Sequence, residues 1–169
     1  MQPAKHSSLT QDTPSVTIRV ATVHDQPSIV SLTNQAFSIE PFLDGERTSA
    51  GEIQALFGTG EFLVAIAKDV LAASVYTEVR GDRGYFGMLS VSASQQGTGL
   101  GRAMIQAAEQ HCRAKGCTRM DITVLSVRPE LPPLYRKFGY SETGRAPFHT
   151  TRQIVDNQPC ELILMSKQL

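Results

Sequence analysis

Residues 89–102 read LSVSASQQGTGLGR, and this stretch decides the fold. A short apolar segment ends in a turn with glycines at 97, 99 and 101, and the turn opens a segment of helical periodicity. The first amides of a helix lack partners inside the helix, and the helix dipole is positive at that end. Glycine lets a ligand approach the backbone closely, because no Cβ intervenes. The stretch therefore predicts a strand, turn and helix that together bind an anion such as a pyrophosphate.

Other glycine-rich turns were compared with this one. A dinucleotide fold needs a third glycine at position 102, which is Arg102, and a P-loop needs Gly-Lys-Ser/Thr where this chain has Gly101-Arg102-Ala103. A methyltransferase with a glycine-rich adenosine site would place an acidic residue at the end of the next strand, which instead reads Leu125-Ser126-Val127-Arg128. On the glycines alone, a tight turn that binds nothing remains an alternative.

The pattern outside this stretch predicts an α+β fold. Capping boxes at Thr22-x-x-Asp25 and Ser49-x-x-Glu52 indicate two helices, ending near Ser38 and Gly58. Further helices are expected over 101–115 and 134–138, and strands over 16–20, 61–67, 70–79, 85–91, 120–127 and 161–165. The order is β-α-α-β-β-β-α-β-α-β, on one mixed, mostly antiparallel sheet flanked by helices. The segment before the last strand is expected to be a polar loop.

Composition limits the partners. The 169 residues fit one domain, which we expect at residues 16–169 after a flexible, polar tail at residues 1–15. Sixteen Lys and Arg balance sixteen Asp and Glu, which argues against a nucleic-acid partner. No apolar run approaches the roughly 18 residues of a membrane span, and the tail lacks the apolar stretch of a signal peptide. We therefore expect a cytoplasmic protein without a membrane partner.

Cysteine and histidine give no metal motif. The cysteines are Cys112, Cys117 and Cys160, an odd number without metal-ligand spacing. The histidines, His6, His24, His111 and His149, match neither an H-x-E nor an H-E-x-x-H pattern. We predict buried, reduced cysteines and no metal cofactor.

Two segments of the chain resemble the GNAT family of N-acetyltransferases. The family's pyrophosphate motif, Gln or Arg, two residues, Gly, one residue, then Gly or Ala, is matched by Gln96-Gly97-Thr98-Gly99-Leu100-Gly101. After the next strand, Leu134-Tyr135-Arg136-Lys137-Phe138-Gly139-Tyr140 resembles the family's L-Y-x-K-x-G-F/Y segment. The two motifs stand in the family's order, separated by a helix and a strand, and the resemblance covers residue 16 to the C-terminus.

The resemblance implies a sheet that splays open near Val91, with the pantetheine arm of acetyl-CoA in the gap. The Val91 amide would contact the thioester oxygen, and Tyr135 would act as the general acid for the leaving thiolate. The alternative for Tyr135 is a packed aromatic residue. The cofactor-binding residues that the resemblance implies are Leu89, Ser90, Val91, Gln96, Gly97, Thr98, Gly99, Leu100, Gly101 and Arg102.

The chain departs from the family at two positions, and the second departure leaves the general base open. Arg128 stands where many relatives have an Asn, and Thr123 stands where some have a Glu base. Glu78 is the tentative base, with His149 as a second candidate, although Glu78 also fits a surface charge at a strand end.

The resemblance implies a function and leaves the acceptor open. It implies an N-acetyltransferase that moves the acetyl group of acetyl-CoA to a primary amine of a small molecule by direct attack. A carboxylate on an amino-acid-like acceptor would be held by Arg145, His149 and Arg152. A non-catalytic acyl-CoA sensor and a protein N-terminal acetyltransferase are the alternatives, and a homodimer is compatible with the resemblance.

Overall fold

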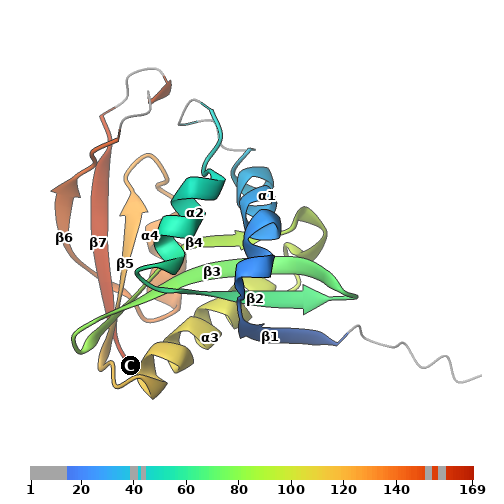
Figure 1. The fold of residues 1–169 in the computed structure, drawn as a ribbon. Helices are drawn as coiled ribbons and strands as arrows, with labels where there is room; N and C mark the ends of the chain where they lie inside the picture. Colours follow the sequence, from blue (N-terminus) through green and yellow to red (C-terminus); the bar gives the residue numbers. More distant parts are fainter. Residues whose placement is uncertain (1–14, 39–41, 43–44, 151–153, 156–158) are drawn as a thin grey trace, which may run out of the picture.

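The computed structural model describes residues 15–38, 42, 45–150, 154–155 and 159–169 (Figure 1). The predicted tail at residues 1–15 lies outside the described residues except for Ser15. A seven-stranded sheet has the order β1-β2-β3-β4-β5-β7-β6. Its strands are β1 (Val16–Val20), β2 (Glu61–Ala67), β3 (Val70–Arg80), β4 (Arg83–Val91), β5 (Arg119–Leu125), β6 (Ser141–Pro147) and β7 (Glu161–Gln168). The helices are α1 (Gln26–Phe37), α2 (Ala50–Phe57), α3 (Leu100–Ala114) and α4 (Leu131–Lys137), with 3-10 turns η1 (Val23–Asp25) and η2 (Ala93–Gln95).

The helices cover both faces of the sheet, because each face has apolar side chains that must be buried. On one face, α3 buries Met104, Ile105 and Ala108 against β2–β5. On the other face, α1 and α2 bury Ile29 and Ile53 against β2 and β3 (Figure 1). We call these the α3 face and the α1–α2 face. In the described part of the chain, no helix has the length and hydropathy needed to cross a bilayer.

The helix-start signals were largely correct. At α2 the Ser49 amide donates to Glu52 Oε2 at 2.8 Å, and the Glu52 amide donates back to Ser49 Oγ at 3.3 Å. The other box caps η1, the turn that leads into α1, because the Thr22 amide donates to Asp25 Oδ2 at 2.7 Å. Arg19 also binds Asp25, and these contacts lower the pKa of Asp25 to about 2.

The predicted order of elements was wrong at one point, because it omitted β6. The residues that were expected to form a polar loop form a strand instead, and this strand pairs antiparallel with β7. The pairing runs from Ser141 opposite Ser166 to Pro147 opposite Glu161. Side chains of β6 are largely exposed, and the strand contains Gly144 and a terminal proline. An edge strand of this kind is held by backbone hydrogen bonds, so it shows no apolar alternation in the sequence.

The sheet is open between β4 and β5. These parallel strands pair only at Arg83–Tyr85 opposite Arg119–Asp121. Two short hydrogen bonds of 2.6 Å from Arg83 to the Asp121 carboxylate fix this closed end. Beyond it, β5 continues to pair with β7 and β4 with β3. The sheet therefore splays as the resemblance implies, already from Phe86 onward, and we call this gap the fork.

Strand β4 contains a bulge on one side of the fork. Tyr76 of β3 lies opposite Gly87, whereas Ser74 lies opposite Ser90, so β4 has one additional residue between these pairs. Met88 sits in the bulge with φ of 51°, in the left-handed region. This conformation costs on the order of 1–3 kcal/mol for a residue with a side chain, and it persists because the surroundings determine it.

A buried ion pair fastens α3 to β7. Glu109 is 6% exposed and accepts hydrogen bonds from Tyr140 Oη at 2.8 Å and from Lys167 Nζ at 2.9 Å. We expect Lys167→Met to lower the free energy of unfolding by about 3 kcal/mol, because it leaves the carboxylate buried without its cation. Urea denaturation measures the loss. Lys137→Met, on the exposed end of α4, is the control and should change stability by less than about 0.5 kcal/mol. Equal losses in the two variants would contradict the prediction.

Candidate active site

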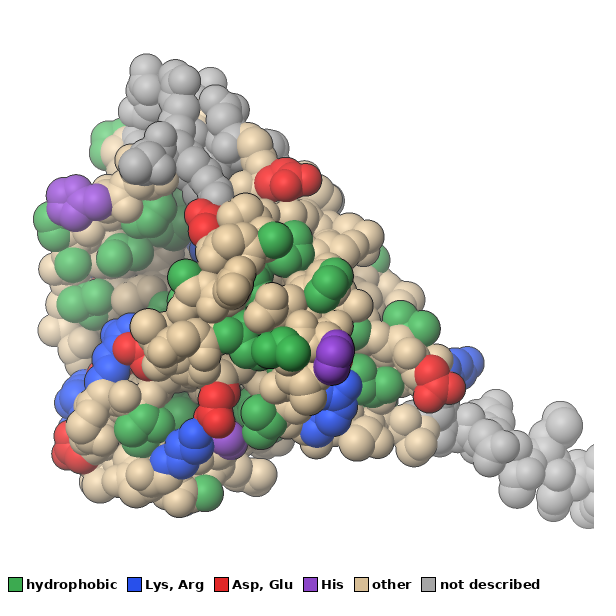
Figure 2. Space-filling view, viewed as in Figure 1, with side chains coloured by type: hydrophobic (Ala, Val, Ile, Leu, Met, Phe, Trp, Pro, Cys, Tyr) green, Lys and Arg blue, Asp and Glu red, His purple; other side chains and the backbone are tan. Residues whose placement is uncertain are grey.

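A cleft of about 460 Å³ lies at the fork. Its walls come from β4, β5, α4, the end of α1 and the connection between α1 and α2, so it reaches from one face of the sheet to the other. In the space-filling view, the surface is hollowed between the β6–β7 side and the α1–α2 side (Figure 2). The residues that line the cleft are Ala36, Phe37, Phe42, Arg47, Phe86, Gly87, Met88, Leu89, Val91, Gln96, Thr123, Val124, Leu125, Arg128, Leu131, Leu134 and Tyr135.

The Val91 amide faces the open side of β4. The amide of the next residue, Ser92, donates to the Ala72 carbonyl of β3 at 2.8 Å. Successive residues of a strand direct their amides to opposite edges, so the Val91 amide points away from β3 and toward the fork. The Val91 carbonyl points the same way, and it accepts a hydrogen bond from Gln96 Nε2 at 3.4 Å. Backbone groups at this edge are therefore available to pair with an extended ligand.

The glycine-rich turn joins this edge to α3. Gly97 and Gly99 have φ of 75° and 89°, a conformation that favours glycine. Hydrogen bonding within α3 begins where the Ala103 amide donates to the Gly99 carbonyl at 3.0 Å. The amides of residues 100–102 precede that bond at the positive end of the helix. Gly101 has no such constraint, because a Cβ there would lie 3.7 Å from Val91 Cγ2, an ordinary contact.

Tyr135, on α4, lines the cleft, as Val91 of β4 does. Its ring packs against Phe86 and Tyr140, with centroids 6.1 and 5.9 Å away. Burial raises the pKa of Tyr135 to about 12, so the phenol stays protonated at neutral pH. The ring is held in position by its aromatic neighbours, and its role as the general acid stays a prediction. Arg128, in the loop before α4, also lines the cleft and pairs with Glu130 at 2.5 Å.

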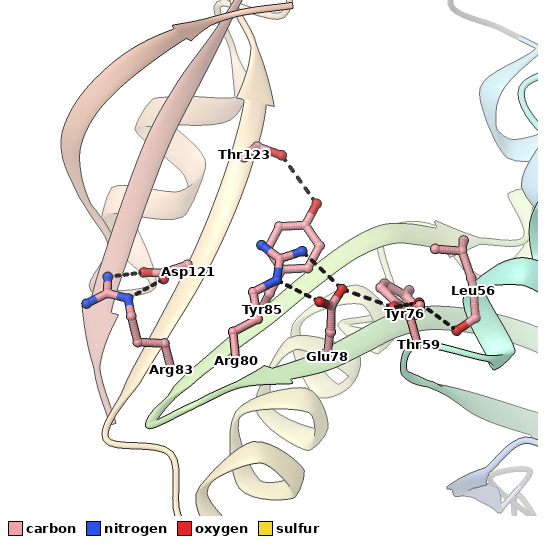
Figure 3. Close-up of polar contacts among 9 residues, drawn as sticks. All are labelled: Leu56, Thr59, Tyr76, Glu78, Arg80, Arg83, Tyr85, Asp121 and Thr123. Atoms are coloured by element: carbon pink, nitrogen blue, oxygen red, sulfur yellow. Dashed lines mark hydrogen bonds and ion pairs between the residues drawn. The ribbon is translucent and has the colours of Figure 1, made fainter. Parts of the chain in front are cut away.

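Glu78 lies on β3, outside the lining of the cleft. Its carboxylate accepts two hydrogen bonds from Arg80, at 2.8 and 3.0 Å, and one from Tyr76 Oη at 3.1 Å (Figure 3). The bond from Arg80 is the main cause of a lowered pKa for Glu78. This ion pair makes the carboxylate a weaker base, and its role as the general base stays a prediction.

Two of the predicted acceptor residues, Arg145 and His149, are not among the described residues that line the cleft. Arg145 lies on β6 and pairs with Glu142 and Glu161, each at 3.2 Å. His149 is exposed beyond the end of β6, and Arg152 lies outside the described residues. Their binding of a carboxylate stays a prediction. Among the described residues, His, Cys, Asp and Glu side chains form no group of three or more that could hold a metal ion.

Sequence reasoning missed the wall formed by the end of α1 and the connection after it. Phe37, Phe42 and Arg47 line the cleft, and the Arg47 guanidinium lies 5.2 Å from the centre of the Phe37 ring. The Val155 amide donates to the Phe42 carbonyl at 3.1 Å, which ties this connection to the one before β7. The only sequence signal was a group of apolar residues, Ile39, Phe42 and Leu43, in the connection between the two helices.

Comparisons with known proteins give a family match and a curated relative. The model of the acetyltransferase (GNAT) domain matches residues 37–152. A mycothiol acetyltransferase from Saccharopolyspora erythraea is 29% identical over 134 residues, which are 76% of this chain and 44% of that protein. The chain thus spans less than half the length of this relative.

Solved structures share the fold. The ribosomal-protein-S18-alanine N-acetyltransferase of Escherichia coli superposes with a TM-score of 0.74 at 18% identity, over 91% of this chain and 94% of that one. A ribosomal-protein-alanine N-acetyltransferase from Brucella melitensis gives a TM-score of 0.72 at 18% identity, over 90% and 99% of the two chains. At this identity the likeness shows the fold and leaves the acceptor open.

Proposed function

Because this chain belongs to the GNAT family of acetyltransferases, we propose that it transfers the acetyl group of acetyl-CoA to the primary amine of a small molecule. One observation carries the proposal. A strand edge with outward-facing backbone groups, a glycine-rich helix start and a protonated tyrosine all border the fork. These are the groups needed to hold a pantetheine arm, a pyrophosphate and a leaving thiolate.

The donor binds along β4 and the start of α3. The backbone of residues 89–91 pairs with the amide groups of the pantetheine arm, as an added strand would. The amides of the turn from Gln96 to Arg102 hold the pyrophosphate at the positive end of α3. Room for a side chain at Gly101 supports this assignment, because the protein itself does not require a glycine there. Arg102 adds a positive charge in the first turn.

The reaction is a direct attack of the amine on the thioester. The Val91 amide donates to the carbonyl oxygen as it gains negative charge, and a fixed donor of this kind contributes roughly 2.7–4 kcal/mol. As the carbon–sulfur bond breaks, Tyr135 gives its proton to the departing thiolate. The proton released by the amine restores the phenol through solvent or a base. Glu78, the base expected from the sequence, lies outside the lining of the cleft and is bound by Arg80.

The class of acceptor rests on two observations. The relative from Saccharopolyspora erythraea is a mycothiol acetyltransferase, and the cleft here has a volume suited to a small molecule. Aromatic and aliphatic side chains make up most of the described lining. We therefore propose an acceptor that presents an apolar portion next to its amine.

The test is a panel of amines incubated with acetyl-CoA and the purified chain. The panel holds amino acids, their amides, amino sugars, polyamines and a peptide with a free N-terminus. Thiol release gives the rate, and mass spectrometry identifies the acetylated product. Acetylation of a small amine is the expected result. Acetylation of the peptide alone would favour a protein N-terminal acetyltransferase. Tight acetyl-CoA binding without thiol release for any amine would favour a sensor.

A further inference from the structure

A side-chain hydrogen bond crosses the fork just beyond its closed end. Tyr85 is the last residue of β4 that pairs with β5, and its Oη lies 3.3 Å from Oγ1 of Thr123 (Figure 3). Thr123 follows Asp121, the last paired residue of β5, by two positions and lines the cleft. The contact therefore joins β4 and β5 where backbone pairing has already stopped.

The Tyr85 ring is held on several sides. The Arg80 guanidinium lies 4.4 Å from the ring centre, and the Tyr76 ring meets it edge to face at 6.5 Å. Gly87 lies beneath it, since a Cβ at that position would come within 2.7 Å of Tyr85 Oη. Any other residue at 87 would push the ring from its place, and the ring would lose its reach to Thr123.

Arg80 is itself held by Glu78. The guanidinium donates two parallel hydrogen bonds to the Glu78 carboxylate, which also accepts from Tyr76 Oη. Tyr76 Oη is 2.9 Å from Thr59 Oγ1, in the turn after α2. Two parallel hydrogen bonds orient a guanidinium more firmly than one bond does. The contacts thus run without interruption from the end of α2 to the wall of the cleft (Figure 3).

These residues lie on the α1–α2 face. Tyr85 and Tyr76 pack with the hydrophobic cluster of that face, whereas Tyr135 packs with the cluster of the α3 face. The proposed pyrophosphate turn opens α3. An acceptor that approaches the thioester from the α1–α2 face would enter on the side that carries Tyr85, whose hydroxyl contacts Thr123 in the lining of the cleft.

We propose that Glu78, Arg80 and Tyr85 are positioning residues that act through Thr123: they set the separation of the β4 and β5 walls where the acceptor amine stands. This proposal rests on the proposed function. It gives Glu78 a role other than that of a base, because the carboxylate orients Arg80 and receives no proton. Loss of the strap formed by Tyr85 and Thr123 would let the walls shift, and small displacements of reacting groups slow catalysis strongly.

The test compares conservative variants with the small amine that turns over fastest in the panel. Tyr85→Phe and Thr123→Val each remove one hydroxyl and should lower kcat about tenfold, with the Kd for acetyl-CoA unchanged. The double variant should be no slower than either single variant, because both remove the same hydrogen bond. Thr123→Ser keeps the hydroxyl and should restore most of the rate. Val79→Ala, whose side chain points to the opposite face from its neighbours Glu78 and Arg80, is the control.

Glu78→Gln separates the two roles of the carboxylate. A positioning role predicts a loss of kcat below about tenfold, with no change in the shape of the pH profile. Loss of a general base would cost about 10²–10⁴ and remove the acidic limb of the profile, which would overturn the proposal. Additive losses in the double variant, or no rescue by Thr123→Ser, would also overturn it.

A stability measurement keeps this proposal apart from the proposed function. Tyr85→Phe and Thr123→Val should each lower the melting temperature by about 2–4 °C, and the double variant no further. If no amine is acetylated, the proposed function fails, while this coupling still shows whether the strap exists. Independent shifts that add together would reject the strap whatever the activity.

Discussion

Tyr135→Phe is expected to lower kcat by about 10²–10⁴, the usual range for loss of a general acid. The variant removes one oxygen and keeps the ring, which packs against Phe86 and Tyr140. The fold and the Kd for acetyl-CoA should therefore stay the same. Steady-state kinetics with the best amine of the panel, together with calorimetry of acetyl-CoA binding, measure the two quantities separately.

The pH dependence gives a second view of the same residue. Burial raises the pKa of Tyr135 to about 12, so the acid form is complete at neutral pH and is lost only as pH rises through that value. Titration of Tyr135 should therefore cause no fall of kcat at moderately alkaline pH. Tyr140→Phe is a matched control, because its hydroxyl is bound to Glu109 inside the core. A Tyr135→Phe variant with the wild-type rate across neutral pH would show that the tyrosine serves packing alone.

Gly101→Glu is expected to weaken acetyl-CoA binding by at least about 10²-fold, because a carboxylate facing a pyrophosphate costs several kcal/mol. The variant is informative because Gly101 has an ordinary backbone conformation and space for a side chain. Gly99→Glu should also weaken binding, but the φ of 89° at that position adds backbone strain. Calorimetry with acetyl-CoA measures the effect.

The control is a glycine in the first turn of another helix. Gly51 follows the first residue of α2 and has open space around its Cα. Gly51→Glu places the same charge at the start of a helix and should leave acetyl-CoA binding unchanged. Equal affinities for wild type and Gly101→Glu would refute the pyrophosphate site, provided that thermal melts show a folded variant.

Most of the fold could be predicted because buried elements leave apolar runs, or apolar residues at a regular spacing, in the sequence. The β2 and β3 strands are apolar runs, and α3 shows buried residues at helical spacing. The β6 strand could not be predicted, since its stability comes from backbone pairing with β7 and its side chains face solvent. The bulge at Met88 left no signal either, because nothing in a methionine indicates a positive φ.

The candidate site divides in the same way. The glycine-rich turn and Tyr135 belong to local motifs, so their positions beside the fork could be expected from the sequence. Contacts between distant segments could not, and Tyr85 with Thr123 is the main example, since 38 residues separate them. Glu78 shows the limit of reading one residue type alone. Its carboxylate suggested a base, and only the structure shows the guanidinium that occupies it.

The bulge in β4 determines which backbone amides of the strand point toward the fork. If the pairing of Tyr76 with Gly87 continued without the additional residue, Val91 would take the place of Ser92 opposite Ala72. Its amide would then donate to the Ala72 carbonyl within the pairing of β3 and β4, and the Ser92 amide would face the fork. The direction of the Val91 amide therefore depends on the number of residues in β4 rather than on their identity. Deletion of one residue between Gly87 and Ser90 would turn the Val91 amide toward β3, although Val91, the glycine-rich turn and Tyr135 would all remain in the chain.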